Sequence, residues 1–311
     1  MTDNFLADIL TGLRKSPKTL PSMYFYNKEG SNLFQMIMKL PEYYLTKSEY
    51  EILDTQSQKI YEDINPQNAF EVVEFGAGDG TKTKLLLEEF LKHTTDFTYS
   101  PIDISQSALD GLEASFTEQL PRLKMNTLND DYFSALESLK ENDSTKLVLF
   151  LGSNIGNFKD DTEVDFLKEM RANITKGDYA LIGFDLKKDP AIILDAYNDK
   201  TGVTREFNMN LLRRVNSDLG ANFDIESFSH YPTYNPITGE ARSYLISLKK
   251  QSVTLGGETI NFEYGEPIFM EVSKKYSAQD IDDLATKTGF RVVKNYHDCR
   301  HFFLDSLWVA E

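Results

Sequence analysis

The sequence predicts an α/β protein with a doubly wound parallel sheet whose last strand is antiparallel, plus a second α+β domain. Three observations support this fold class. Short apolar runs alternate with amphipathic segments over residues 69–184, the alternation stops at 190–273, and the chain closes with two strand-like runs joined by a short turn. Of the 311 residues, 41% are hydrophobic, which is enough for a large core and excludes wholesale disorder.

The expected parallel strands are short apolar runs that end near glycines or polar loops. They lie at 69–75, 98–104, 123–127, 146–152 and 178–184. The helical patterns between them lie at 81–93, 106–120 and 162–174. Short connections of this kind favour parallel strands joined by crossover helices.

The C-terminal segment predicts a hairpin at the edge of this sheet. A helix is expected at 277–288 with Ser277 as its N-cap, followed by strands at 290–296 and 302–309. The turn at 297–300 is too short for a crossover helix, so these two strands are expected to be antiparallel. A parallel sheet finished in this way is characteristic of the Rossmann-like class I methyltransferase fold.

The remaining segments are expected to form the second domain. The chain up to about residue 64 is predicted to contain helices at 4–13 and 48–60 and loops between them. Region 190–273 opens helically and continues with strand-like pieces at 244–248 and 258–264. Both predicted domains are therefore discontinuous, one comprising 48–187 and 275–311 and the other 1–47 and 188–274.

Charge and cysteine content restrict the class of protein. The 33 basic and 49 acidic residues give a net charge of −16, which disfavours a nucleic acid partner because polyanions are repelled. Cys299 is the single cysteine, and the N-terminus shows no secretory pattern, so a cytoplasmic location is expected. No run approaches the ~18 apolar residues of a membrane span. The spacing of His297 and His301 does not indicate a zinc site, and no metal is expected.

The sharpest motif is a glycine loop at 74–81 that follows a strand and opens a helix. Gly76, Gly78 and Gly80 have the spacing GxGxG, and they let the backbone turn sharply and approach a ligand closely. The dinucleotide fingerprint GxGxxG would require glycine where Thr81 stands.

Two acidic positions follow the next two predicted strands. Asp103 could accept hydrogen bonds from both hydroxyls of a ribose, and Asp131, in segment 129–132, would lie near an adenine ring. Together with the glycine loop and the terminal hairpin, they resemble an S-adenosylmethionine (SAM) site. The alternative is that the glycines form only a tight turn and that Asp103 is a solvated strand end.

The loop after the fourth predicted strand ends at Asn157. Ligands of open α/β sheets lie at the carboxyl ends of the strands, so this loop is expected to face the transferred methyl group. An Asn carbonyl can accept an N–H and orient the lone pair of an attacking amine. The alternative role for Asn157 is that of a turn or N-cap residue.

Segments spread over nearly the whole chain resemble the histidine Nα-methyltransferase family of the ergothioneine pathway. The most specific are LPEYY at 40–44 and FLGSNIGN at 150–157. The other matching segments, besides the glycine loop, are 17–21, 24–26, 30–34, 185–189, 196–199, 207–210 and 271–274. The resemblance implies a SAM-dependent class I methyltransferase whose substrate lies between its two domains.

The resemblance also implies a role for individual side chains at the amino-acid site. Asn157 would hold the α-amine directly and Tyr26 would hold it through water, while the hydroxyls of two other tyrosines would bind the α-carboxylate. An imidazole would be bound by a carboxylate and a hydroxyl. The tyrosines for the carboxylate are Tyr43 and Tyr197, and the imidazole-binding pair is Glu271 and Ser273. Without the resemblance, each tyrosine could equally be ordinary aromatic packing, and strand alternation would put Glu271 on a solvated face.

On the cofactor side, the resemblance implies that five residues line the SAM site. These are Gly76, Gly78, Lys82, Asp103 and Asp131, with Asp130 as the alternative to Asp131.

The expected activity is SAM-dependent trimethylation of the α-amine of a small-molecule amino acid, histidine first, by a monomer. One departure affects the substrate: Ser243 stands where the family's histidine enzymes have a methionine near the substrate ring. The alternatives are a tryptophan- or tyrosine-like amino acid as substrate and a non-catalytic relative that binds SAM or an amino acid. A protein or RNA methyltransferase is disfavoured by the charge and by the lack of a basic patch.

Overall fold

The computed structural model describes residues 2–139, 144–159 and 162–311, which form two compact units. Unit 1 comprises Met1–Tyr44 and Lys188–Lys274, and unit 2 comprises Leu45–Lys187 and Lys275–Glu311. Each unit contains its own sheet.

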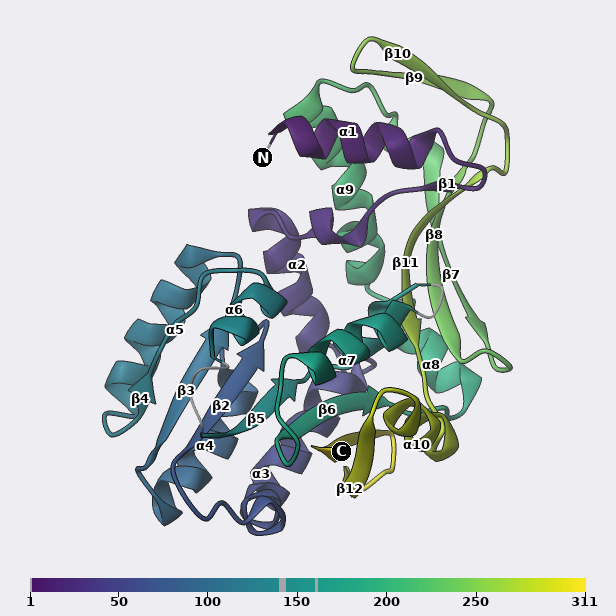
Figure 1. The fold of residues 1–311 in the computed structure, drawn as a ribbon. Coiled ribbons are helices and arrows are strands. Elements are labelled where there is room, and N and C mark those ends of the chain that lie inside the picture. Colours follow the sequence, from purple (N-terminus) through teal and green to yellow (C-terminus); the bar gives the residue numbers. More distant parts are fainter. Residues whose placement is uncertain (1, 140–143, 160–161) are drawn as a thin grey trace. The chain divides into compact units, whose positions relative to one another are not determined.

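Unit 2 is built on a seven-stranded sheet in the order β12-β13-β6-β5-β2-β3-β4 (Figure 1). Neighbouring strands are parallel except at β13, which is antiparallel to both β12 and β6. The strands are β2 (Phe70–Phe75), β3 (Phe97–Ile102), β4 (Lys124–Met125), β5 (Thr145–Phe150), β6 (Tyr179–Asp185), β12 (Phe290–His297) and β13 (Phe303–Ala310). The predicted class I methyltransferase fold is thereby confirmed.

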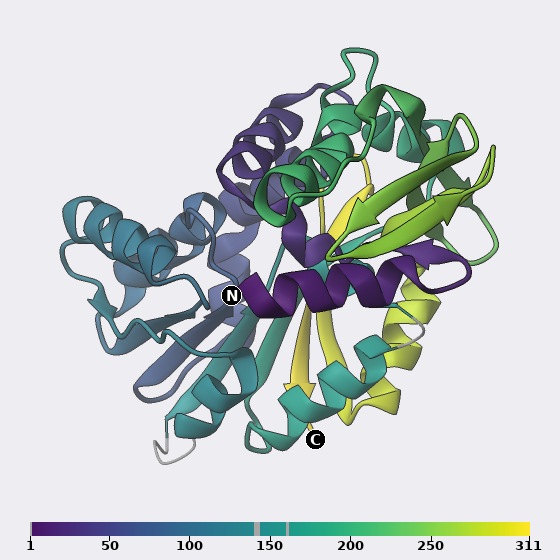
Figure 2. The same cartoon turned by 90° about the horizontal axis from the view of Figure 1, so that it is seen from above.

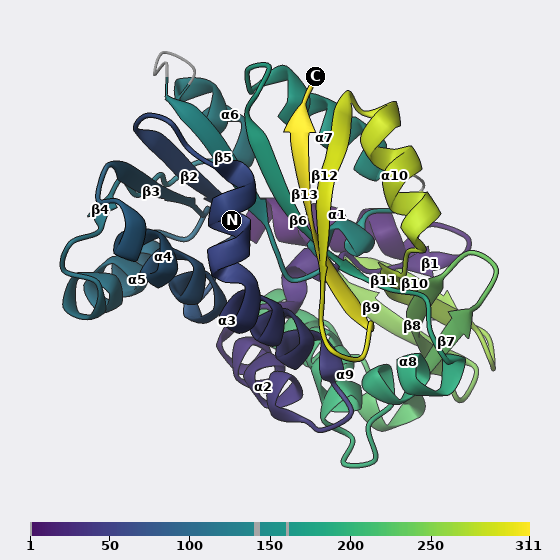
Figure 3. The same ribbon diagram turned by 90° about the horizontal axis from the view of Figure 1, so that it is seen from below.

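Helices cover both faces of this sheet. In Figure 3, α3, α4 and α5 lie along one side of the strands, while α6, α7 and α10 lie along the other. Their bounds are α3 (Tyr44–Ile64), α4 (Thr81–His93), α5 (Gln106–Gln119), α6 (Tyr132–Ser138), α7 (Thr162–Ala172) and α10 (Ala278–Lys287). The expected N-cap Ser277 is confirmed, and it forms a capping box with Asp280.

The core of unit 2 explains why its strands are apolar throughout. Every residue of β2 is buried, because both faces of a doubly wound sheet are covered. Phe75 of β2, Phe166 of α7 and Leu284 of α10 belong to one buried cluster on the second face. The strand ends are thereby fixed relative to one another, and the loops that follow them start from defined positions.

Unit 1 contains a four-stranded sheet in the order β1-β11-β8-β7 and a separate hairpin of β9 and β10. The strands are β1 (Lys18–Thr19), β7 (Phe228–Asn235), β8 (Glu240–Ser247), β9 (Gln251–Leu255), β10 (Glu258–Phe262) and β11 (Pro267–Lys274). Its helices are α1 (Thr2–Leu13), α2 (Lys28–Lys39), α8 (Pro190–Tyr197) and α9 (Val203–Leu219). Figures 1 and 2 show α1 beside the β9–β10 hairpin, where Arg14 pairs with Glu258.

The elements that were not expected from the sequence include α2, α6 and β1. Helix α2 replaces a predicted loop; it starts at the N-cap Asn27, whose side chain accepts the N–H of Gly30 at 2.8 Å. Helix α6 follows Asp131, and β1 is a two-residue strand paired with β11. Among the described residues, the structure contains no helix with the length and apolar character needed to span a bilayer.

Candidate active site

The predicted glycine loop joins β2 to α4 in unit 2. Gly76, Gly78 and Gly80 have φ angles of 67°, 58° and 68°, a left-handed region that favours glycine. A Cβ at Gly80 would lie 2.5 Å from Cδ1 of Leu112, so this glycine is required by packing. A Cβ at Gly78 would meet no heavy atom within 4 Å. The loop therefore presents bare backbone to open space at Gly78, which fits the close approach of a ligand.

The two predicted acidic positions lie in different surroundings. Asp103 follows β3, is half-buried, and accepts the N–H of Ser105 at 2.8 Å. Asp131 is exposed and caps α6, since its carboxylate accepts the N–H of Phe133 and of Ser134, each at 3.1 Å. The Ser134 hydroxyl also donates to Asp131 at 2.6 Å, and these hydrogen bonds lower the pKa of Asp131. Asp131 therefore has a capping role that the sequence analysis did not assign.

The turn that contains Asp131 lies next to the glycine loop. The ring of Tyr132 stacks on Phe75 with centroids 4.7 Å apart, and a Cβ at Gly76 would lie 2.9 Å from the Tyr132 hydroxyl. The structure thus brings Gly76 and Asp131 to the same edge of the sheet, as the strand order requires.

Lys82, in the first turn of α4, forms an ion pair with Glu49 of α3. The side chain of Glu49 is completely buried. Burial lowers the pKa of Lys82, but the nearby carboxylate of Glu49 outweighs it and raises the pKa overall. Glu49 could not be recognised from the sequence, because a single glutamate in a helical segment carries no motif.

Two further carboxyl groups are buried near Lys82. Glu74 accepts hydrogen bonds from the hydroxyls of Thr83 and Tyr99, and burial raises its pKa to about 7. Asp305 of β13 is fully buried, and neither of its side-chain oxygens has a hydrogen-bond partner within the described ranges. Burial raises the pKa of Asp305 well above its ordinary value, because a carboxyl group ionises less readily away from water.

The raised pKa of Glu74 predicts a pH-dependent stability. The native state holds the Glu74 proton up to about pH 7, whereas the unfolded state loses it near 4.5, so the free energy of unfolding falls as pH rises between these values. Glu74→Gln mimics the protonated form. Urea unfolding should show that the free energy of unfolding of the variant, relative to that of wild type, rises by up to about 3 kcal/mol from pH 5 to pH 8. A constant difference at both pH values would contradict the raised pKa.

The loop that follows β5 ends in the short 3₁₀ helix Asn154–Asn157. The loop is fixed at two points: the side-chain Oγ of Ser153 accepts the N–H of Asp185 at 3.0 Å, and the Tyr276 hydroxyl donates to the backbone carbonyl of Ile155 at 3.1 Å. Asn157 is exposed, and its Nδ2 lies 3.5 Å from Oδ1 of Asn154. A fixed loop that ends in an exposed carboxamide is suited to orienting a ligand.

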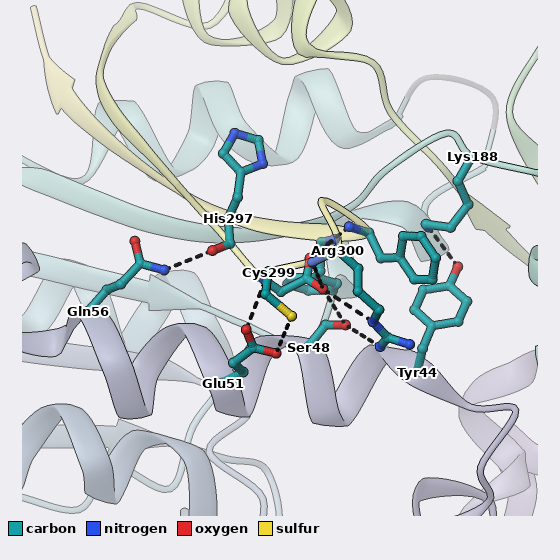
Figure 4. Close-up of polar contacts among 11 residues, drawn as sticks. Tyr44, Ser48, Glu51, Gln56, Lys188, His297, Cys299 and Arg300 are labelled. Carbon is teal, nitrogen blue, oxygen red and sulfur yellow. Dashed lines mark hydrogen bonds and ion pairs between the residues drawn. The ribbon is translucent and has the colours of Figure 1, made fainter.

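The turn between β12 and β13 contains the two histidines that are four residues apart. Figure 4 shows this turn against α3, where the Cys299 N–H donates to Glu51 at 2.8 Å. The rings of His297 and His301 have centroids 4.7 Å apart. Over residues 2–139, 144–159 and 162–311, no three His, Cys, Asp or Glu side chains are grouped as metal ligands would be.

In unit 1, two of the predicted tyrosines contact the same phenylalanine. The ring of Tyr26 is 54% exposed and packs edge-on against Phe34, with centroids 5.6 Å apart. The ring of Tyr43 also lies edge-on to Phe34, with centroids 6.4 Å apart. Desolvation raises the pKa of Tyr26, and the negative charge of Glu271 raises it further. Tyr26 and Glu271 are therefore electrostatic neighbours.

A β-bulge in β11 determines the orientation of Glu271. Phe269 pairs with Tyr244 of β8, but Glu271 pairs with Ser243, so Met270 is an extra residue. Directly paired residues point to the same face of a sheet, and Ser243 is buried on the face that packs on α9. Glu271 therefore faces the core side, and the solvated face favoured by simple alternation is wrong.

The same face carries the other predicted pocket residues. Ser273 pairs with Ala241, and both are buried. Ser243 is 1% exposed, and its hydroxyl has no hydrogen-bond partner in the described part of the chain. Tyr197 is the last residue of α8, which packs on β7 and β8.

Comparison with known proteins identifies the family. Residues 5–310 match the family model described as "Histidine-specific methyltransferase, SAM-dependent". The chain is similar to the histidine N-alpha-methyltransferase of Mycobacterium tuberculosis, with 32% identity over 94% of this chain and 90% of that one. The corresponding Mycolicibacterium smegmatis enzyme is 32% identical over 91% and 88%. The L-tryptophan methyltransferase of Psilocybe serbica is 28% identical over 94% and 89%. The chain therefore belongs to the histidine-specific, SAM-dependent methyltransferase family and is a SAM-dependent N-methyltransferase.

Proposed function

We propose that this enzyme methylates the α-amine of histidine, and that it adds three methyl groups in succession. The observation that supports histidine is the bulge in β11, because with it the half-buried carboxylate of Glu271 and the buried hydroxyl of Ser273 share one face of the sheet. An imidazole has two ring nitrogens, and such a pair can hydrogen-bond to both of them.

Unit 2 would hold SAM and unit 1 would supply most of the groups that bind the amino acid. The open space at Gly78 and the carboxylate of Asp103 at the end of β3 are consistent with a ligand that combines a methionine moiety and a ribose. Gly76, Lys82 and Asp131 would complete this site. SAM supplies an electrophilic methyl group, so the protein needs no strong nucleophile of its own.

The amine must be neutral to attack, with its lone pair directed at the methyl carbon. Asn157 would accept an N–H of the amine, and the exposed position of its carboxamide supports this. The raised pKa of Tyr26 keeps its phenol protonated at neutral pH, so Tyr26 would orient the amine through water rather than take its proton. Water would accept the proton. Tyr43 and Tyr197 would bind the α-carboxylate.

A tryptophan-like substrate is the second candidate. Ser243 and Ala241, which pair with Glu271 and Ser273 on the neighbouring strand, have small side chains, and small side chains beside the substrate would suit a larger ring. Against this, an indole has a single N–H, whereas an imidazole offers two ring nitrogens to the Glu271–Ser273 pair.

The decisive experiment incubates the enzyme with SAM and each of the twenty amino acids, and follows the masses of the products. Histidine is expected to gain one, two and then three methyl groups. Nα-acetylhistidine, which keeps the imidazole but lacks a basic amine, is the control and should gain none. Methylation of the control would contradict transfer to the α-amine, and no product from any amino acid would favour a binding protein.

A further inference from the structure

Glu49 connects two loops at the carboxyl edge of the sheet in unit 2. Its Oε1 accepts the backbone N–H of Gly152 at 2.6 Å, and its Oε2 pairs with Lys82. Gly152 starts the loop that ends at Asn157, and Lys82 is the second residue of the helix that follows the glycine loop. One side chain therefore contacts both the segment proposed to bind SAM and the segment proposed to bind the amine.

The backbone at Gly152 is shaped for this contact. Gly152 and Ser153 have φ angles of 79° and 56°, so two consecutive left-handed residues turn the chain directly after β5. The amide donated to Glu49 lies at this turn. Loss of that hydrogen bond would leave a half-buried N–H without its acceptor and release the start of the loop.

The helix that carries Glu49 is itself held firmly. Figure 4 shows the first turns of α3 beside the β12–β13 turn. The Ser48 hydroxyl donates to Asp298 at 3.2 Å, and the Cys299 N–H donates to Glu51 at 2.8 Å. These contacts flank Glu49 in sequence, so the position of its carboxylate is defined by the sheet.

Strand β6 also leaves space for this carboxylate. A Cβ at Gly183 would lie 2.4 Å from Oε1 of Glu49, a distance that no real side chain tolerates. Gly183 has ordinary backbone angles, so the need for glycine comes from the neighbouring carboxylate and the Phe303 ring rather than from backbone strain.

Among the described groups that surround Lys82, Glu49 is the one in direct ion-pair contact. Neither side-chain oxygen of Asp305 has a hydrogen-bond partner among the described residues, and Glu74 accepts its hydrogen bonds from hydroxyl groups. Glu49 is completely buried and Lys82 is partly exposed, so removing Lys82 would leave a buried charge without its ion-pair partner.

We propose that Glu49 is a positioning residue for methyl transfer: it fixes the Gly152–Asn157 loop and the start of α4 in one arrangement, so that Asn157 and the SAM-binding segment stay aligned. The inference rests on the proposed function for its effect on turnover. The contact with Gly152 is independent of that function.

The test uses two substitutions at Glu49. Glu49→Gln keeps an oxygen that can accept the Gly152 N–H but loses the ion pair, whereas Glu49→Ala loses both contacts. We expect the alanine variant to lower kcat by about tenfold, because small misplacements of reacting groups are costly, and the glutamine variant to raise the KM for SAM with kcat within about threefold. Hydrogen exchange of the Gly152 amide should accelerate in the alanine variant alone.

Two further variants keep the test decisive. Gly183→Ala displaces the carboxylate without removing its charge, and it should accelerate Gly152 exchange even if Glu49→Ala does not fold. The matched control is Glu71→Gln. It neutralises a different buried carboxylate, which lies on β2 and accepts a hydrogen bond from the Ser100 hydroxyl. It should leave Gly152 exchange and kcat unchanged.

The outcomes separate the inference from the proposed function. Unchanged Gly152 exchange in both Glu49→Ala and Gly183→Ala would overturn the inference, as would a kcat for folded Glu49→Ala equal to that of Glu71→Gln. If exchange of the Gly152 amide accelerates in Glu49→Ala but Asn157→Ala keeps full turnover, the contact of Glu49 with the loop is supported and the role proposed for Asn157 is wrong. In the double variant, Glu49→Ala should add little to Asn157→Ala, because both act through the same loop.

Discussion

Asn157→Ala is expected to lower kcat for histidine on the order of a hundredfold while the affinity for SAM is retained, because orientation of the amine is lost. The structure supports a local effect. Asn157 is exposed at the end of a loop whose backbone is held by Ser153 and Tyr276, so its side chain can be removed without unfolding the loop. Turnover and SAM binding by calorimetry are the two measurements.

A sharper form of this test compares the three methylation steps. The dimethylated amine has no N–H in its neutral form, so Asn157 has nothing to accept in the third step. With Nα,Nα-dimethylhistidine as substrate, the variant should be slowed much less than with histidine. Asn173→Ala serves as the control, since Asn173 lies beyond α7 and bonds to the Glu169 carbonyl. Equal slowing of all three steps would remove the proposed role.

Glu271→Ala is expected to lower kcat/KM for histidine by roughly tenfold to a hundredfold, the effect of losing a hydrogen bond to a charged group. Most of this loss should appear in the KM for histidine, since the side chain binds the substrate ring and not the methyl donor. The KM for SAM should stay within about twofold. Steady-state kinetics with each substrate varied in turn provide the measurement.

Glu271→Gln is the matched control for this prediction. It keeps the shape and one acceptor oxygen, so it should retain more histidine activity than the alanine variant. Removing the charge should also lower the pKa of Tyr26, because Glu271 contributes to its elevation. Equal changes in the KM values for histidine and SAM would show that Glu271 supports the fold rather than the ring.

The parallel sheet could be predicted from the sequence because buried strands are continuous apolar runs. The run FEVVEF of β2 is buried at all six positions, and it ends where the glycines begin. The antiparallel pairing of β12 and β13 could be predicted because the turn that joins them is short. These features depend on local composition and connection length, which a sequence displays directly.

The features that could not be predicted from the sequence depend on contacts between distant segments. Helix α2 was not recognised because its first turn contains Gly30, which lies against the Phe25 carbonyl. Glu49 has no motif, and its partners lie 33 and 103 residues away. The orientation of Glu271 depends on one unpaired residue, which shifts the alternation without altering composition. Family resemblance supplied the candidate residues, and the pairing of β11 with β8 supplies the reason for their orientation.

The extra residue in β11 determines which single-residue deletions in this strand would keep Glu271 and Ser273 on the same face of the sheet. Met270 is unpaired, so deleting it would leave Glu271 opposite Ser243, and both polar groups would keep their direction at the cost of one buried side chain. Deleting Val272 would instead move Ser273 into an outward position and separate the pair. Because side chains alternate between the two faces of a strand, Glu271 and Ser273 would stay on one face if Met270 were deleted, and would be separated if Val272 were deleted.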